Sequence, residues 1–80
     1  MFHKPEKKMV NVYIDGACEH NGKPNAVAGY AVYFGRPDDP RNEYARVIGK
    51  QSNNTGELTA FIRCLQILGD DCTDIINIYT

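Results

Sequence analysis

The sequence contains no tryptophan, no long apolar run and almost no net charge. No stretch approaches the ~20 consecutive apolar residues that a membrane-spanning helix needs, so we expect no membrane partner. Residues 1–8 are polar and have no hydrophobic segment of the kind that a signal peptide carries. The formal net charge of −1 provides no global basic field for an anionic partner, although metal ions or a local patch can supply positive charge.

Cysteine is scarce and odd in number, with Cys18, Cys64 and Cys72 far apart and no Cys-x-x-Cys pair. Such usage indicates free thiols in a reducing compartment. We therefore expect an intracellular protein of the cytoplasm or nucleus.

The length of 80 residues allows at most one domain. Its 42% apolar and 24% charged content is typical of a soluble globular protein. We interpret residues 1–8 as a flexible leader, because chain termini are commonly unordered, and residues 9–80 as the folded part.

Three strands are predicted in the first half of the chain. Val10, Val12 and Ile14 alternate with polar residues, which predicts a strand over 9–15. Further strands are predicted at 28–34, apolar on both faces, and at 43–48, with the mixed pattern of an edge strand. Short connections make these three an antiparallel meander.

A helix and a fourth strand follow. Asn54 and Glu57 resemble a capping pair, so the helix is predicted to begin near Asn54 or Thr55 and to end at Gly69. Its predicted buried stripe consists of Leu58, Phe61, Ile62, Leu65 and Leu68. The β-branched run at 75–80 predicts a buried strand parallel to the first, reached by a right-handed crossover. The fold class expected is therefore α/β.

Two acids are candidates for metal chemistry. The first strand carries Asp15 to its end, and Glu57 is expected to point from the helix toward the sheet. Converging carboxylates repel each other unless a cation such as Mg²⁺ or Mn²⁺ lies between them. Two simpler interpretations remain open: Asp15-Gly16 is an ordinary strand-ending turn, or Glu57 only caps its own helix.

The order of four motifs resembles type 1 ribonuclease H, in particular the catalytic domain of the eukaryotic-type enzymes. The motifs are YIDGAC at 13–18, NG at 21–22, AGYAVY at 28–33 and SNNTGELTA at 52–60. The resemblance implies a ribonuclease H-like mixed sheet, with three antiparallel strands followed by a helix crossover. It also implies an endonuclease that hydrolyses the RNA strand of RNA–DNA hybrids by two-metal-ion catalysis with Mg²⁺, or alternatively Mn²⁺.

The resemblance also assigns roles to residues. Asp15 matches the catalytic aspartate that bridges both metals, and Glu57 matches the catalytic glutamate that contacts one metal and a 2′-hydroxyl. Three residues match minor-groove contacts, and the backbone near Cys18 matches a contact to a 2′-hydroxyl. The three minor-groove candidates are Asn21, Asn53 and Asn54.

The chain departs from the family pattern at its end. The family's fourth strand ends in an aspartate directly after a threonine like Thr80, and the sequence ends at that threonine. We therefore expect residues 9–80 to be the N-terminal part of a truncated ribonuclease H-like domain that is inactive alone. The alternatives are a non-catalytic nucleic-acid-binding or assembly module, completed by self-association or by a second chain, and a metal-free structural relative.

Overall fold

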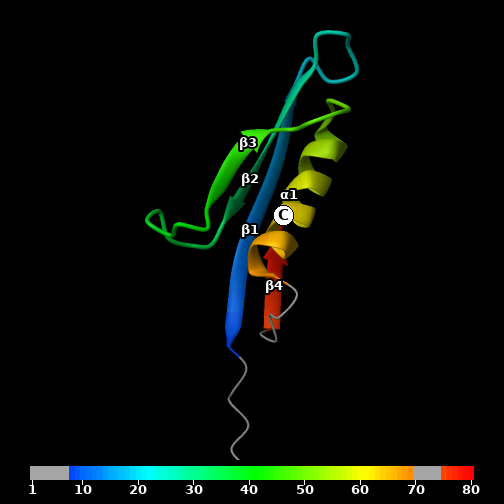
Figure 1. Ribbon diagram of the computed structural model, residues 1–80. Coiled ribbons are helices and arrows are strands. Elements are labelled where there is room, and N and C mark those ends of the chain that lie inside the picture. Colours follow the sequence, from blue (N-terminus) through cyan, green and yellow to red (C-terminus); the bar gives the residue numbers. More distant parts are fainter. Residues whose placement is uncertain (1–7, 70–74) are drawn as a thin grey trace, which may run out of the picture.

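The computed structural model describes residues 8–69 and 75–80, which form a four-stranded mixed sheet covered by one helix (Figure 1). The sheet order is β3-β2-β1-β4, with β1 antiparallel to β2, β2 antiparallel to β3, and β1 parallel to β4. This confirms the predicted α/β class and topology. The elements are β1 (Met9–Glu19), β2 (Val27–Tyr33), β3 (Glu43–Arg46), α1 (Asn53–Leu68) and β4 (Ile75–Tyr79).

Several expectations concern parts of the chain outside the described residues. The predicted leader lies there except for Lys8, as does the loop after the helix with Cys72. Within the described parts of the chain, no helix is long and apolar enough to cross a membrane.

The first strand is longer than predicted. It continues beyond Asp15 to Glu19, because the residues after Asp15 pair in register with β2 as far as Glu19 and Val27. The chain then reverses in a loop where His20 and Gly22 have positive φ angles of 55° and 83°. The hairpin extends past the rest of the sheet, at the end where α1 begins (Figure 1).

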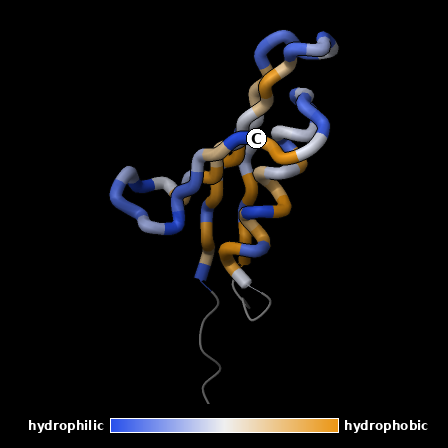
Figure 2. The backbone as a smooth tube through the Cα atoms, turned by 45° about the horizontal axis from the view of Figure 1, so that its top comes forward, coloured by the Kyte–Doolittle hydropathy of each residue, from blue (hydrophilic) through white to orange (hydrophobic). Residues whose placement is uncertain are grey.

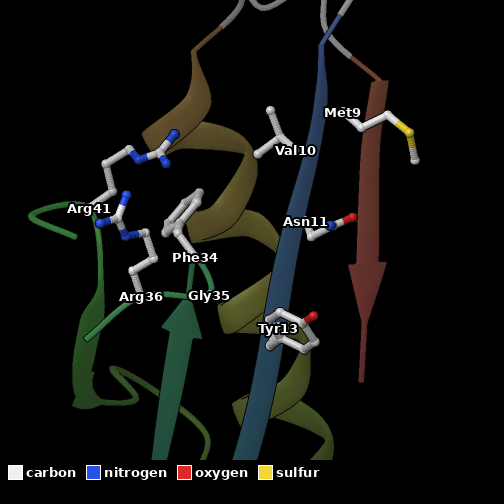
Figure 3. A pocket seen from close by; sticks show the side chains of 8 residues that line it. All are labelled: Met9, Val10, Asn11, Tyr13, Phe34, Gly35, Arg36 and Arg41. Carbon is white, nitrogen blue, oxygen red and sulfur yellow. The ribbon is translucent and has the colours of Figure 1, made fainter. Parts of the chain in front are cut away.

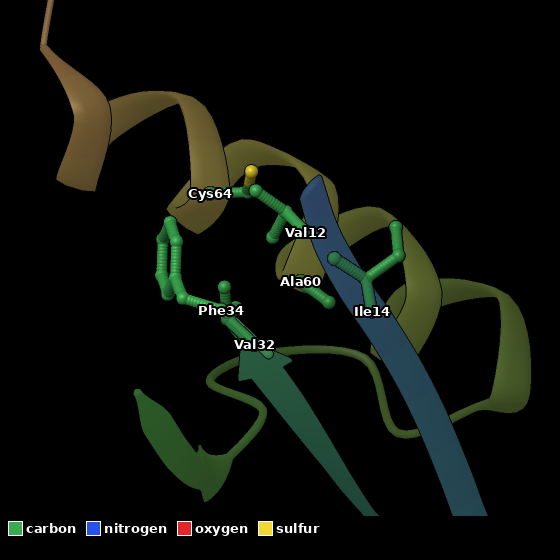
Figure 4. Packing of buried hydrophobic residues seen from close by; sticks show 6 residues of the cluster. All are labelled: Val12, Ile14, Val32, Phe34, Ala60 and Cys64. Atoms are coloured by element: carbon green, nitrogen blue, oxygen red, sulfur yellow. The ribbon is translucent and has the colours of Figure 1, made fainter. Parts of the chain in front are cut away.

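The core lies between α1 and one face of the sheet. Alternation along the strands places Val12 and Ile14 of β1 beside Val32 of β2, and α1 covers them with small side chains (Figure 4). Val12, Val32 and Cys64 are completely buried. Figure 2 shows the apolar residues concentrated in the strands and the helix, with polar residues in the loops.

The predicted buried stripe of the helix is wrong for four of its five residues. Leu58, Phe61, Ile62 and Leu65 are 41–59% exposed, whereas Leu68 is partly buried. The side chains that face the sheet are small and recur every four residues: Gly56, Ala60 and Cys64. Small residues allow the helix axis to approach the strands closely. The prediction used hydropathy, which measures the transfer of side chains from water and takes no account of steric fit. It therefore favoured the helix face with the larger apolar side chains.

The start of the helix also differs from the prediction. Ser52 is the N-cap residue, and its hydroxyl accepts a hydrogen bond from the Thr55 N–H at 3.1 Å. The Thr55 hydroxyl accepts the Ser52 N–H at 3.0 Å in return. This reciprocal capping box makes the predicted pair of Asn54 and Glu57 wrong. The predicted end at Gly69 is confirmed.

Candidate metal and nucleic-acid site

The first turn of α1 lies directly on the backbone of β1. A Cβ atom added to Gly16 would be 2.2 Å from the Glu57 backbone nitrogen and 2.4 Å from the Gly56 carbonyl carbon. A Cβ atom added to Gly56 would be 2.8 Å from the Gly29 carbonyl oxygen. Only glycine permits this approach of helix to strand. The contact places the backbone of Glu57 against the residue that follows Asp15.

Both carboxylates of the predicted site are exposed. Asp15 lies on the sheet face opposite Val12 and Ile14, and Glu57 of α1 is exposed to solvent. The expectation that Glu57 points toward the sheet is therefore wrong, because Gly56 occupies the position next to the strands. Burial of charge thus gives no reason for a metal ion here. Exposure instead leaves both carboxylates open to ions and substrate.

The simpler explanation of Glu57 as a capping residue does not hold. Ser52 and Thr55 make both bonds of the capping box, so Glu57 has no part in it. The packing of the adjacent Gly56 on Gly16 sets the position of the Glu57 backbone.

The carboxylates of Asp15 and Glu57 have the oxygen donors that fit a hard divalent cation, and they would supply two of its ligands. Carboxylate oxygens are the donors that Mg²⁺ and Mn²⁺ prefer. Among residues 8–69 and 75–80, however, no group of three or more histidine, cysteine, aspartate or glutamate side chains is arranged to hold a metal. In the described part of the chain, the candidate ligands Asp15 and Glu57 are related through the backbone contact of Glu57 with Gly16.

The hairpin loop and the start of the helix are joined by a predicted site residue. Oδ1 of Asn21 accepts a hydrogen bond from the backbone N–H of Asn53 at 3.3 Å. Asn21, Asn53 and the adjacent Asn54 are all exposed. The structure thus brings together two segments that are 32 residues apart in the sequence.

Cys18 lies on the same hairpin, near the end of β1. It is half-buried, and its thiol donates to the carbonyl oxygen of Glu19 at 3.4 Å. In register it pairs with Ala28 of β2. Cys18 and the buried Cys64 are both free thiols.

Asp15 lines a shallow hollow of about 280 Å³ on the sheet face opposite α1. Its lining consists of Asp15, Ala17, Gly29, Tyr30, Ala31, Tyr44 and Ala45. A larger hollow of about 380 Å³ lies beside the N-terminal half of β1 and the end of β2 (Figure 3). None of the predicted site residues lines this second hollow.

Sequence analysis missed Gln51, whose side-chain amide bridges β2 and the segment that leads into α1. One glutamine in a polar loop carries no sequence signal of such a role. It also missed a cluster in which Arg63 of α1 and Tyr30 of β2 both contact Glu43 of β3. The bonds from Arg63 and then Tyr30 lower the pKa of Glu43 to about 2.

Comparison with known proteins identifies the family. The family model described as RNase H matches residues 7–80. A ribonuclease H of Crithidia fasciculata is 48% identical over 56 residues, covering 68% of this chain and 11% of that protein. A ribonuclease H of Schizosaccharomyces pombe is 48% identical over 63 residues, covering 78% of this chain and 24% of that protein. A ribonuclease H of a Wolbachia species is 40% identical over 74 residues, covering 92% of this chain and 47% of that protein.

The chain thus spans less than half the length of each of these relatives. The family match nevertheless extends over nearly all of its own residues. The chain belongs to the ribonuclease H family.

Proposed function

We propose that this chain is the metal- and hybrid-binding part of an endonuclease that hydrolyses the RNA strand of RNA–DNA hybrids. The observation that supports the proposal is the contact of Gly56 and Glu57 with Gly16, which sets the backbone of Glu57 against the residue that follows Asp15. Membership of the ribonuclease H family supports the same reaction class.

In this proposal Asp15 and Glu57 hold Mg²⁺, or Mn²⁺ in its place. When bound, divalent ions supply activation of the attacking water and stabilisation of the leaving oxygen. Asp15 would hold both ions, and Glu57 would hold one of them and contact a 2′-hydroxyl near the scissile phosphate. Because the described residues contain no group of three or more metal-binding side chains, we expect weak metal binding and little hydrolysis by the 80-residue chain itself.

Hybrid recognition is assigned to the exposed amides beside the carboxylates. Asn21, Asn53 and Asn54 present side-chain donors and acceptors from the hairpin and the helix start. The minor groove of an A-like duplex displays base edges and 2′-hydroxyls, and the 2′-hydroxyl distinguishes RNA from DNA. The backbone near Cys18 is the fourth contact in this proposal.

The proposal is tested by titrating the isotope-labelled chain with Mn²⁺ and following the amide signals by NMR. We expect paramagnetic broadening centred on Asp15, Gly16 and Glu57, and loss of that broadening in Asp15→Asn and Glu57→Gln. Asp38→Asn is the matched control, because it removes an exposed acid that pairs with Arg36 in a loop. Broadening that is absent at Asp15, or that survives both site substitutions, contradicts the proposed metal site.

The catalytic part is tested in an intact ribonuclease H domain that includes residues 9–80. Asp15→Asn should abolish cleavage of a labelled RNA–DNA hybrid while Asp38→Asn leaves the rate unchanged. An unchanged rate for Asp15→Asn would refute the proposed mechanism.

One observation favours the assembly function as a second candidate. The outer face of α1 exposes Leu58, Phe61, Ile62 and Leu65 along one side, and exposed apolar patches commonly mark interaction surfaces. Size-exclusion chromatography with light scattering tests it, because a stable monomer of this chain would count against self-association.

A further inference from the structure

The side-chain amide of Gln51 bridges the backbone of Ala28 in β2 and that of Val47, just after β3. It takes the place of a direct backbone hydrogen bond between these two residues. The Val47 N–H donates to the Ala28 carbonyl oxygen at 2.9 Å. In an antiparallel pair the return bond would run from the Ala28 N–H to the Val47 carbonyl. Here the Ala28 N–H donates to Gln51 Oε1 at 2.6 Å, and Gln51 Nε2 donates to the Val47 carbonyl oxygen at 2.7 Å.

This bridge directs the chain from the end of β3 toward the start of α1. Gln51 Nε2 also donates to the carbonyl oxygen of Gly49 at 3.0 Å, so the same side chain fixes the backbone of the loop that precedes it. Gln51 directly precedes the N-cap residue Ser52, and Asn53 follows with its backbone bond to Asn21. A single amide therefore links the inner strand β2 to the first residues of the helix.

Gln51 is attached to the sheet through a buried residue. This residue, Ala28, is completely buried and pairs in register with Cys18 of β1. A buried backbone N–H left without a partner costs roughly 1–3 kcal/mol, so the amide of Gln51 is held firmly at this point. The start of α1 is thereby held against the strand pair that carries Cys18 and leads to Asn21.

We propose that Gln51 is a positioning residue for hybrid recognition. It holds Asn53 and Asn54 at the helix start in a fixed relation to Asn21 and Cys18 on the hairpin, so that all four reach one stretch of minor groove together. The inference rests on the proposed hybrid-binding function and adds a residue that contacts no substrate.

The chain contains a matched control for this role. At the opposite end of β2, the Phe34 N–H donates to Asn42 Oδ1 at 2.8 Å, and Asn42 Nδ2 donates to the Arg36 carbonyl oxygen at 2.7 Å. Asn42 thus makes the same kind of amide bridge between backbone groups as Gln51. Its partner Phe34 lies six residues beyond Ala28, the partner of Gln51, which is about 20 Å at the usual rise per strand residue.

The experiment compares Gln51→Ala with Asn42→Ala in the same chain by two measurements. The first is the affinity for a short fluorescein-labelled RNA–DNA hybrid in Mg²⁺ buffer, measured by fluorescence anisotropy. The second is the amide chemical shift of Asn53 and the scalar coupling across its bond to Asn21, measured by NMR without nucleic acid. Urea unfolding of both variants checks that their loss of stability is similar.

We expect Gln51→Ala to weaken hybrid binding about tenfold, to move the Asn53 amide signal and to abolish its coupling to Asn21. Asn42→Ala should leave the affinity within about twofold of the unsubstituted chain and should leave the Asn53 signal in place. Equal weakening by both variants would mean a merely structural role for Gln51 and would overturn the inference. So would an unchanged Asn53 signal in Gln51→Ala.

The experiment has two further possible outcomes, and each of them has a defined consequence for the inference. If the unsubstituted chain does not bind the hybrid, the proposed function fails, and the Asn53 signal alone decides whether Gln51 positions the helix start. If Gln51→Ala does not fold, Gln51→Glu replaces it, because a carboxylate still accepts from Ala28 but cannot donate to Val47 or Gly49. The same shift of the Asn53 signal is then expected, and its absence overturns the inference.

Discussion

Arg63 of α1 and Glu43 of β3 form a two-point ion pair, with Nε to Oε2 at 2.7 Å and Nη2 to Oε1 at 2.8 Å. The hydroxyl of Tyr30 in β2 donates to the same carboxylate at 2.5 Å. The bond to Glu43 raises the pKa of Tyr30, and the bonds to Arg63 and Tyr30 lower that of Glu43 to about 2. The cluster joins the helix to the edge strand of the sheet.

This cluster predicts a pH dependence of stability. Because the folded pKa of Glu43 lies below its ordinary value of 4.5, its stabilisation is present above about pH 4.5 and is lost as the pH falls toward 2. Both side chains are about one third exposed, so solvent screens the pair. Glu43→Gln should therefore lower the free energy of unfolding by only about 1 kcal/mol at pH 7.

Urea unfolding at pH 7, 4 and 2.5 provides the measurement. The difference between Glu43→Gln and the unsubstituted chain should shrink at each lower pH. Asp38→Asn, on an exposed loop pair at 3.7 Å, serves as the control with almost no effect on stability. A difference that stays constant with pH would show that Glu43 does not titrate as described.

Gly16→Ala tests the contact between helix and strand. The added Cβ atom would meet the Glu57 backbone nitrogen at 2.2 Å, so the start of α1 must move away. We expect a loss of roughly 2–3 kcal/mol in the free energy of unfolding and a loss of the Mn²⁺ effect at Glu57. Gly29→Ala is the comparison, since its Cβ atom would lie 3.3 Å from the Ala45 carbonyl oxygen. Equal stability of both variants would contradict the close approach.

The capping box predicts different effects for neighbouring residues. Ser52→Ala should lower the free energy of unfolding by about 1 kcal/mol, because the Thr55 N–H loses its acceptor. Glu57→Gln should change it by less than about 0.5 kcal/mol, since Glu57 is exposed and outside the box. Thermal unfolding followed by circular dichroism measures both. A larger loss from Glu57→Gln than from Ser52→Ala would restore the capping explanation of Glu57.

The orientation of α1 is tested by a pair of substitutions. Ala60→Leu adds volume to a fully buried position and should destabilise the chain by roughly 1–3 kcal/mol. Leu58→Gln removes a side chain that is 59% exposed and should have little effect on stability. Chemical denaturation of the two variants is the measurement, and the reverse order would mean that the helix buries its larger apolar face.

Cysteine reactivity provides an independent measure of the core. Burial raises the pKa of the Cys64 thiol, and Cys64 is completely buried, whereas Cys18 is only partly so. Because the thiolate is the reactive form, iodoacetamide should modify Cys18 at least about tenfold faster than Cys64. Peptide mapping by mass spectrometry distinguishes the two sites. Similar rates in the folded chain, with full labelling of both under urea as the reference, would contradict the packing.

Much of the fold follows from local patterns. The alternation of Val10, Val12 and Ile14 predicted β1, and the β-branched run at 75–80 predicted β4, because side chains alternate across a strand whatever its neighbours are. The short connections predicted the meander, and the preference for glycine after a helix predicted the end of α1 at Gly69. The apolar run that follows the helix predicted the parallel crossover. The motif resemblance led to the ribonuclease H family, which the family match confirms.

The candidate site could be predicted in its residues but not in its geometry. Asp15, Cys18, Glu57 and the asparagines were named from motifs, and their roles remain predictions. The bond between Asn21 and Asn53 joins residues far apart in the chain, and no local pattern encodes such a contact.

By itself, then, the sequence determined the order and type of the elements, because these depend on the period of apolar residues and on local capping and turn preferences. Only the tertiary structure decided which face of α1 meets the sheet, since Gly56, Ala60 and Cys64 fit against Gly16 and the core where larger side chains do not. The same steric fit decided that Glu57 lies outside the core with its backbone against Gly16. Hydrophobicity drives burial, but close packing selects the face.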